Sequence, residues 1–240
     1  MTALFVADLH LAPERPTITR AFLDFLAGAE AADLYILGDL FEAWVGDDDD
    51  GPLARAVIAA LAAASARGVR VHFQAGNRDF SVGRRFARET GARLLGDQEL
   101  ISTHGRRLLL LHGDTLCTDD VAYQRFRRCV RHPLTLFALR RLPLAVRHRI
   151  ARRWRETSIR HNRNKPESIM DVNEQAVAAA FRDSGAQLMI HGHTHRPGRH
   201  GYRIDDRHCE RIVLGDWSDA GGWCARIDDA GSLELRTLPI

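Results

Sequence analysis

Near its carboxyl end the chain reads Leu188-Met189-Ile190-His191-Gly192-His193-Thr194-His195-Arg196-Pro197, and this stretch decides the fold. An apolar run of strand type ends in a loop that carries two imidazoles at positions i and i+2, His193 and His195. Imidazole is the commonest metal ligand among side chains. In a chain with 12 histidines the stretch alone fits a solvated turn as well as a metal site, so the remaining sequence must decide.

The same unit, an apolar run followed by polar residues of ligand type, occurs four times earlier in the chain. Residues 4–7 precede Asp8 and His10, residues 34–37 precede Asp39, residues 69–73 precede Asn77, and residues 108–111 precede His112. Amphipathic segments separate the runs, among them one that begins near Pro52 and ends before Gly68. Three further strands are expected at 211–214, 223–227 and 233–238. Buried strands that alternate with helices predict an α/β fold with helices on the outer faces.

In such folds, ligands bind at the carboxyl ends of the strands. Seven candidate metal ligands from five strands fall there: Asp8, His10, Asp39, Asn77, His112, His193 and His195. Nitrogen and oxygen donors without thiolate favour an ion such as Mn, Fe or Zn, and seven donors exceed the needs of one ion. Two ions that share a carboxylate could clamp the attacking and leaving oxygens of a phosphoryl group.

These motifs resemble, in order and spacing, those of the calcineurin-like metallophosphoesterases. The matching segments are Asp8-x-His10, Gly38-Asp39, Gly76-Asn77-Arg78-Asp79, His112-Gly113-Asp114 and Gly192-His193-Thr194-His195. The resemblance implies a two-sheet α/β sandwich flanked by helices. It implies that Asp8, His10 and His195 hold one ion, that Asn77, His112 and His193 hold a second, and that Asp39 bridges them. Manganese is the expected metal, and Asp39, Asn77, Arg78 and His112 are the expected catalytic residues.

A narrower resemblance covers nearly the whole chain, which is expected to form a single domain over residues 1–240. Segments 37–42, 76–80, 116–120, 169–173 and 191–197 are similar to those of the UDP-2,3-diacylglucosamine pyrophosphatases of lipid A biosynthesis. That family implies a Mn-dependent hydrolysis of UDP-2,3-diacylglucosamine to UMP and 2,3-diacylglucosamine 1-phosphate. A water activated by two metals would attack the UMP phosphorus, at the cytoplasmic side of the inner membrane, where the protein would be peripheral.

Arg78 departs from the wider superfamily, whose usual motif has histidine in this place. A histidine can protonate an alkoxide leaving group, whereas a guanidinium cannot act as an acid near neutral pH. A phosphate leaving group, with a pKa of about 6, needs no proton. Its negative charge can be met by the bidentate guanidinium, so Arg78 favours a pyrophosphate substrate over a phosphodiester of an alcohol.

Residues 121–165 form a basic block with 13 Arg and one Lys against the single acid Glu156. The block carries +13 in a chain of net charge +3, which leaves −10 for the rest. Apolar stripes run among the arginines, and we interpret residues 121–166 as two or three amphipathic helices inserted as a cap. The alternative is that these helices simply pack on the domain and expose a basic face to solvent. An anionic membrane surface is the expected partner, and the few aromatic residues argue against nucleic acid.

Lys165 is the only lysine in the chain, which suggests a specific need for an ammonium group there. In the resembled family, the positions of Asp120, Ser158, Asn162 and Lys165 contact the head group of the substrate. Asn77, Arg78 and His193 are implied to reach the substrate as well. Ser158, Asn162 and Lys165 would share one side of a helix from about Leu144 onward, since they are spaced at i, i+4 and i+7.

Several smaller features complete the expectations. Asp79 and Asp114 should orient neighbouring ligands, and His191 should be packed rather than a ligand. The run 47–50 should be a solvated turn that caps the next helix, and Asp171 should cap the helix that ends near Gly185. The roles of residues 216 and 217 stay open.

The composition and the amino-terminal sequence argue against a secreted, disulfide-rich or membrane-spanning protein. The four cysteines are scattered and fit reduced thiols, the amino terminus lacks the pattern of a signal peptide, and no apolar window approaches the ~20 residues of a spanning helix. A nuclease or cyclic-nucleotide phosphodiesterase on the same scaffold is the alternative enzyme. A binding module that has lost catalysis is the other alternative, which the complete ligand set disfavours. The sequence does not fix the oligomeric state; a monomer is the default expectation.

Overall fold

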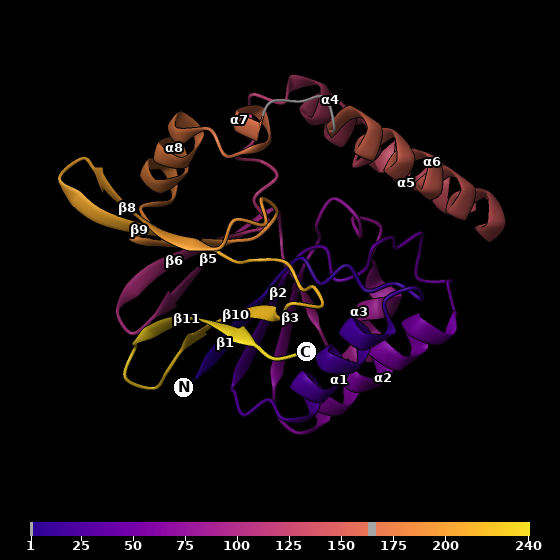
Figure 1. Cartoon of the computed structure of the whole chain (residues 1–240), viewed down its shortest axis with the longest axis horizontal. Helices are drawn as coiled ribbons and strands as arrows, with labels where there is room; N and C mark the ends of the chain where they lie inside the picture. Colours follow the sequence, from indigo (N-terminus) through magenta and orange to yellow (C-terminus); the bar gives the residue numbers. More distant parts are fainter. Residues whose placement is uncertain (1, 163–166) are drawn as a thin grey trace.

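Two β-sheets stack face to face with helices on their outer sides (Figure 1). This computed structural model describes residues 2–162 and 167–240, without the side chains of 161–168. The first sheet has the order β11-β10-β1-β2-β3-β4 and the second β5-β6-β7-β9-β8. The predicted two-sheet α/β sandwich is therefore confirmed.

The first sheet contains the amino-terminal strands and the end of the chain. Its members are β1 (Ala3–Val6), β2 (Asp33–Leu37), β3 (Arg70–Gln74), β4 (Arg93–Leu94), β10 (Gly222–Ile227) and β11 (Leu233–Leu238). Strands β1 to β4 run parallel, whereas β10 and β11 extend the sheet in antiparallel fashion. Helices α1 (Pro16–Ala27), α2 (Pro52–Ala66) and α3 (Arg84–Thr90) lie along its outer face (Figure 1).

The second sheet is built from the middle and later part of the chain. Its members are β5 (Gln98–Thr103), β6 (Arg106–Leu111), β7 (Leu188–His191), β8 (Gly198–Ile204) and β9 (Arg207–Val213). Strands β6, β7 and β9 run parallel, and β5 and β8 pair antiparallel at the two edges. Helix α8 (Glu174–Ser184) covers the outer face (Figure 1).

Strand β1 shows how the layers are held together. Phe5 packs with Leu108 and Ile190 in the core between the sheets, whereas Leu4 and Val6 join the core beneath the outer helices. Successive side chains of a strand point to opposite faces, so a strand buried on both sides must be apolar at every position. A third core lies under α8. Both sheets are therefore covered, and the carboxyl ends of β1, β2, β3, β6 and β7 remain for the site.

Three helices stand apart from the sandwich between β6 and α8. They are α4 (Val121–Val130), α5 (Pro133–Arg141) and α6 (Leu144–Asn162), and the short α7 (Glu167–Met170) follows them. In Figure 1 they project above the edge at which the candidate ligands lie. Helix α4 begins at Asp120, whose side chain accepts a hydrogen bond from the amide of Tyr123. The name cap is kept below for α4, α5 and α6.

Two local expectations are wrong. Helix α8 is capped by Asn173, which accepts from the amides of Gln175 and Ala176, and not by Asp171 two residues earlier. The turn 47–50 does not cap α2, which begins at Gly51 without a side-chain cap. Instead Asp47 accepts from amides at the start of α3, those of Gly83, Arg85 and Phe86. A carboxylate near a helix start in the sequence can thus serve a helix that is close only in space.

Candidate metal centre

Five loops bring the seven predicted ligands to one place, each loop following a strand end. Five of these residues have positive φ angles: Asp8 (54°), His10 (49°), Asp39 (53°), His193 (69°) and His195 (54°). They make up most of the eight non-glycine residues with positive φ among those described. Such a conformation costs on the order of 1–3 kcal/mol and persists where the surroundings impose it, often at functional sites.

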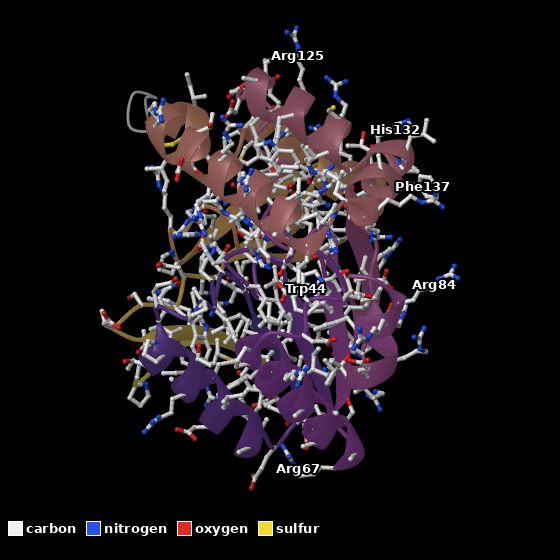
Figure 2. All side chains as sticks on the ribbon, turned by 90° about the vertical axis from the view of Figure 1, so that its right-hand side faces the viewer. Trp44, Arg67, Arg84, Arg125, His132 and Phe137 are labelled. Carbon is white, nitrogen blue, oxygen red and sulfur yellow. The ribbon has the colours of Figure 1, made fainter. Side chains whose placement is uncertain are left out.

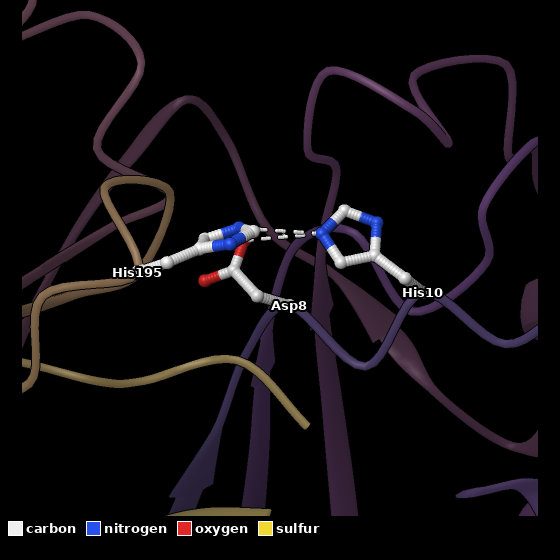
Figure 3. A group of neighbouring side chains, drawn as sticks. All are labelled: Asp8, His10 and His195. Carbon is white, nitrogen blue, oxygen red and sulfur yellow. Dashed lines mark hydrogen bonds and ion pairs between the residues drawn. The ribbon is translucent and has the colours of Figure 1, made fainter. Parts of the chain in front are cut away.

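Asp8, His10 and His195 form the first group (Figure 3). The Nε2 atoms of the two histidines lie 3.3 Å apart, and Nε2 of His195 lies 3.4 Å from Oδ1 of Asp8. Asp8 is fully buried, and its Oδ2 accepts from the amide of His193 at 2.7 Å. That bond ties the first group to the loop that carries the last two ligands.

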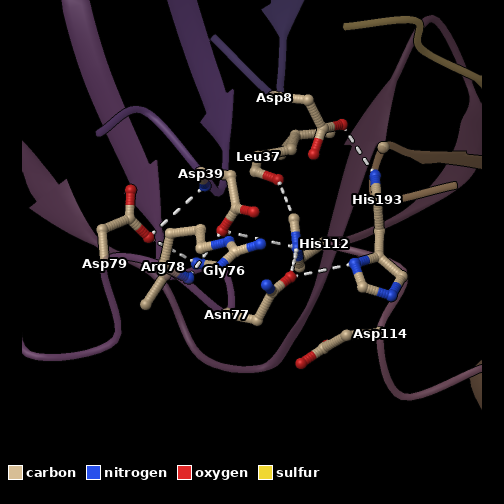
Figure 4. Close-up of polar contacts among 12 residues, drawn as sticks. Asp8, Leu37, Asp39, Gly76, Asn77, Arg78, Asp79, His112, Asp114 and His193 are labelled. Atoms are coloured by element: carbon tan, nitrogen blue, oxygen red, sulfur yellow. Dashed lines mark hydrogen bonds and ion pairs between the residues drawn. The ribbon is translucent and has the colours of Figure 1, made fainter. Parts of the chain in front are cut away.

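Asn77, His112 and His193 form the second group (Figure 4). Oδ1 of Asn77 lies 2.9 Å from both Nε2 of His112 and Nδ1 of His193. Burial, followed by the neighbouring His112, lowers the pKa of His193 to about 4, so its imidazole is neutral at pH 7. A neutral imidazole has a lone pair to offer a metal.

Asp39 lies between the two groups. Its Oδ2 is 3.8 Å from Nε2 of His10 and its Oδ1 is 3.7 Å from Nε2 of His112. The amide of Arg78 donates to Oδ1 at 2.8 Å and helps to fix the carboxylate. Its carboxylate therefore lies within 3.8 Å of a histidine nitrogen in each group.

Several observations test whether these residues suit cations. Oδ1 of Asp8 is buried and has no hydrogen-bond partner among the described residues. His112 donates through Nδ1 to the carbonyl of Leu37 at 2.9 Å, which orients Nε2 toward Oδ1 of Asn77. A buried carboxylate oxygen without a hydrogen-bond partner is satisfied by a positive ion. The donor set therefore fits divalent metals, and it contains no thiolate.

Close backbone contacts explain two glycines in the motifs. A Cβ on Gly192 would lie 2.1 Å from Oδ2 of Asp8, and one on Gly76 would lie 2.1 Å from Oδ1 of Asp39. Any side chain at either position would displace a candidate ligand. The Gly-His-Thr-His and Gly-Asn-Arg-Asp motifs therefore need glycine for space.

Asp79 holds neighbouring ligand loops in place, as expected, whereas the carboxylate of Asp114 contacts the cap instead of a ligand. Asp79 accepts from the amides of Gly76 and Leu40, both at 2.7 Å. Burial, together with the charge of Asp39, raises its pKa to about 6. Asp114 accepts from the hydroxyl of Tyr123 at 2.8 Å and from Nε of Arg127 at 2.7 Å, so it connects the loop of His112 to helix α4.

Two supporting carboxylates were not predicted from the sequence. Oε2 of Glu42 lies 3.3 Å from Nδ1 of His10, and Oδ2 of Asp216 lies 4.0 Å from Nδ1 of His195. Carboxylates behind ligating histidines fix the tautomer and the ring orientation. Burial would lower the pKa of His10, but Glu42, Asp39 and Asp8 outweigh it and raise the pKa to about 9.

His191 is packed as expected: it is fully buried and accepts from Arg211 at 3.2 Å.

A cavity of about 710 Å³ opens from the ligands to the cap. Its apolar wall includes Trp44, Phe126, Leu136, Leu139, Ile150 and Trp154. Figure 2 shows Trp44 beneath the cap helices. Asp120, Ser158, Asn77, Arg78 and His193 also line the cavity, so the structure brings these predicted substrate contacts together. Lys165 and the side chain of Asn162 lie outside the described residues.

Arg78 extends from the ligand loop into this cavity. Its Nε is buried and has no hydrogen-bond partner among the described residues, the nearest carboxylate oxygen being Oε1 of Glu42 at 3.9 Å. A buried donor without a partner is costly unless a ligand supplies the acceptor. Arg78 thus presents a cation with an unused hydrogen-bond donor beside the candidate metal site.

The strand-end ligands, their paired groups and the two-sheet sandwich define a class of protein. The family of calcineurin-like phosphoesterases matches residues 1–197, and the chain belongs to it. A solved structure, described as that of a novel archaeal phosphodiesterase, has a TM-score of 0.50 and 11% identity, covering 99% of this chain and 100% of its own. At that identity the likeness shows the fold alone.

Curated relatives narrow the family further. The UDP-2,3-diacylglucosamine hydrolase of Pseudomonas paraeruginosa (strain DSM 24068 / PA7) is 49% identical over 233 residues, covering 96% of this chain and 97% of its own. The enzyme of the same name from Azotobacter vinelandii (strain DJ / ATCC BAA-1303) is 48% identical over the whole of both chains. The resemblance found in the motifs is confirmed.

Proposed function

We propose that this protein hydrolyses the pyrophosphate bond of UDP-2,3-diacylglucosamine to UMP and 2,3-diacylglucosamine 1-phosphate. The names of its relatives support the substrate. One structural observation supports it independently: the ligand cluster and Arg78 line the same cavity as a set of large apolar side chains, among them Trp44, Phe126 and Trp154. A substrate for such a cavity needs a charged phosphoryl end and an apolar end. A nuclease or cyclic-nucleotide phosphodiesterase has no use for the apolar wall.

The metal requirement is part of the proposal. Asp8, His10 and His195 would hold one divalent ion, Asn77, His112 and His193 a second, and Asp39 both. Mn²⁺ suits these nitrogen and oxygen donors. Such a pair supplies Lewis acidity, which polarises a phosphoryl group and lowers the pKa of water.

We propose that protein side chains stabilise the leaving group and bind the head group of the substrate. Arg78 would meet the charge that develops on the departing lipid phosphate, because its Nε is buried and unpartnered among the described residues. Asp120 and Ser158 are placed to bind the head group from the cavity wall, and we propose the same for Asn162 and Lys165, which the structure does not describe. Residues 121–166 would act as a cap within a single domain.

Hydrolysis of the diacylated substrate in ¹⁸O-labelled water tests the reaction and its polarity together. We expect the label in UMP, because attack at the UMP phosphorus lets the lipid phosphate leave as an anion without a general acid. Mass spectrometry of both products reads the result. Label in the diacylglucosamine phosphate would reverse the assignment of attacked and leaving groups, and absence of hydrolysis would refute the substrate.

Acyl chains are expected to contribute strongly to turnover, since each buried methylene is worth about 0.8 kcal/mol. In detergent-dispersed substrate, Leu136→Asn should lower kcat/KM for the diacylated substrate about tenfold and leave deacylated UDP-glucosamine, already far poorer, unchanged. Leu134→Asn is the matched control, because it lies on the same helix, is 71% exposed and does not line the cavity. Equal kcat/KM for acylated and deacylated substrates would exclude an acyl-binding cavity.

We also propose a peripheral position at the cytoplasmic side of the inner membrane. Among the described residues, five of the seven exposed large apolar side chains lie on the cap: Val121, Phe126, Leu134, Phe137 and Ile159. Arginines surround them, and the guanidinium of Arg141 lies 4.1 Å from the ring centre of Phe137. Exposed apolar side chains on arginine-rich helices favour an anionic lipid surface. No helix in the described part of the chain is long and apolar enough to cross a bilayer.

Vesicle binding tests the membrane face. On vesicles with anionic phospholipid, Leu134→Ser with Phe137→Ser should weaken partitioning at least about tenfold, since each side chain can contribute about 1.5–3 kcal/mol when buried. Leu94→Ser with Leu100→Ser, also exposed but outside the cap, is the control and should have little effect. Equal sedimentation of both variants with the vesicles would exclude this face.

A further inference from the structure

Glu42 occupies a junction between the metal ligands and the cap. It follows β2, and its amide donates to the carbonyl of Leu11 at 3.0 Å, which holds this part of the backbone in place. The side chain is 13% exposed. Its two carboxylate oxygens face different partners: Oε2 lies 3.3 Å from Nδ1 of His10, and Oε1 lies 2.7 Å from Nε of Arg155.

Arg155 belongs to α6, so this contact crosses from the sandwich to the cap. Glu42 and Arg155 both line the cavity, on the side where it meets the first group of ligands. Arg155 is about half exposed, and an ion pair of that kind contributes little to folding by itself. Because this ion pair adds little to stability, we look for its role in the contact it makes between α6 and the carboxylate beside His10.

We propose that Glu42 is a positioning residue that couples the cap to the first metal site through the chain Arg155–Glu42–His10. The carboxylate of Glu42 lies 3.3 Å from Nδ1 of His10, and this attraction favours the ring orientation in which Nε2 faces His195. The same carboxylate receives the guanidinium of the cap helix. A cap displaced from the cavity withdraws Arg155 and leaves Glu42 less well ordered behind His10. This inference rests on the two-metal proposal above.

Coupling of this kind is reciprocal. If the position of α6 affects the first metal site, metal in that site must favour the position of α6 to the same extent. Substrate that fills the cavity beneath α6 should therefore tighten metal binding, and metal should tighten substrate binding by the same factor. A carboxylate that merely supported His10 would give no such dependence on a residue of the cap.

Mn²⁺ binding measures the coupling without any turnover. Free Mn²⁺, followed by electron paramagnetic resonance during titration of the full-length protein, gives the dissociation constants. Glu42→Gln should weaken one of the two ions about 10–100-fold, the range found when a partner behind a ligating histidine is lost. Arg155→Gln, which touches no ligand directly, should weaken the same ion by several-fold. The double variant should bind no more weakly than Glu42→Gln alone.

Arg153→Gln is the matched control, since it makes the same change at an exposed position of α6 that does not line the cavity. Circular dichroism establishes that each variant is folded. An unchanged Mn²⁺ affinity in Arg155→Gln, or additive effects in the double variant, would overturn the coupling while leaving the two-metal site intact. Wild-type protein that bound no Mn²⁺ would overturn the metal centre itself and the coupling with it.

Discussion

Asp39→Asn is expected to lower kcat/KM by about 10³-fold or more, which exceeds the usual loss on removing one charge-stabilising donor. The reason is position: the carboxylate lies within 3.8 Å of Nε2 of His10 and 3.7 Å of Nε2 of His112, so its charge serves both groups. Asparagine keeps the volume and tolerates the φ of 53° better than alanine does, so the loss would report charge rather than backbone strain.

The measurement combines turnover at saturating Mn²⁺ with a Mn²⁺ titration. Asp39→Ala should be at least as damaging, and chelation of the wild-type protein should abolish activity until Mn²⁺ is restored. Asp24→Asn, an exposed change on α1, should have no effect. Two bound ions together with a tenth or more of the activity in Asp39→Asn would contradict a bridging role.

Arg78→Ala is the second large effect, with an expected loss of about 2–4 kcal/mol of transition-state stabilisation, or about 30- to 10³-fold in kcat/KM. Nε of the guanidinium is buried without a hydrogen-bond partner among the described residues, and loss of this group leaves the departing phosphate without its fixed positive partner. Arg78→His should not rescue activity, because it supplies an acid that a phosphate leaving group does not need and removes the bidentate fork.

Mn²⁺ affinity should change little in Arg78→Ala, which separates this effect from that of Asp39. Arg84→Ala is the control: its side chain points away from the cap and the cavity (Figure 2). Activity in Arg78→His above that in Arg78→Lys would show that the leaving group takes a proton, and the proposed role of Arg78 would be wrong.

The sandwich could be predicted because its signals in the sequence are local. A strand buried on both faces is apolar throughout, and the polar residue after it lies at the carboxyl edge of a parallel sheet. Those two facts are enough to predict that Asp8, Asp39, Asn77, His112 and His193 lie close together. Edge strands such as β5 and β8 were missed because their side chains are largely exposed and carry no continuous apolar signal.

The roles of several carboxylates could not be predicted, because they depend on contacts between segments that are distant in the sequence. Glu42 and Asp216 stand behind histidines that are 32 and 21 residues away in the sequence, and no spacing rule connects them. Asp47 resembled a cap for the next helix, yet it serves α3, about 36 residues later. In each case the carboxylate could accept hydrogen bonds from several different groups, and only the packing of distant segments determines which group it contacts.

The positive φ angles at five of the seven candidate ligands also restrict which metal ions this site can bind. Histidine, aspartate and asparagine tolerate left-handed backbone far better than most residues with a Cβ. Glutamate or cysteine could coordinate a metal equally well in chemical terms, but the loops would resist either one. The backbone conformation therefore favours imidazole and short carboxylate donors at these positions. It disfavours substitution of the ligands by cysteine, and with it a change to the softer metal ions that thiolates select.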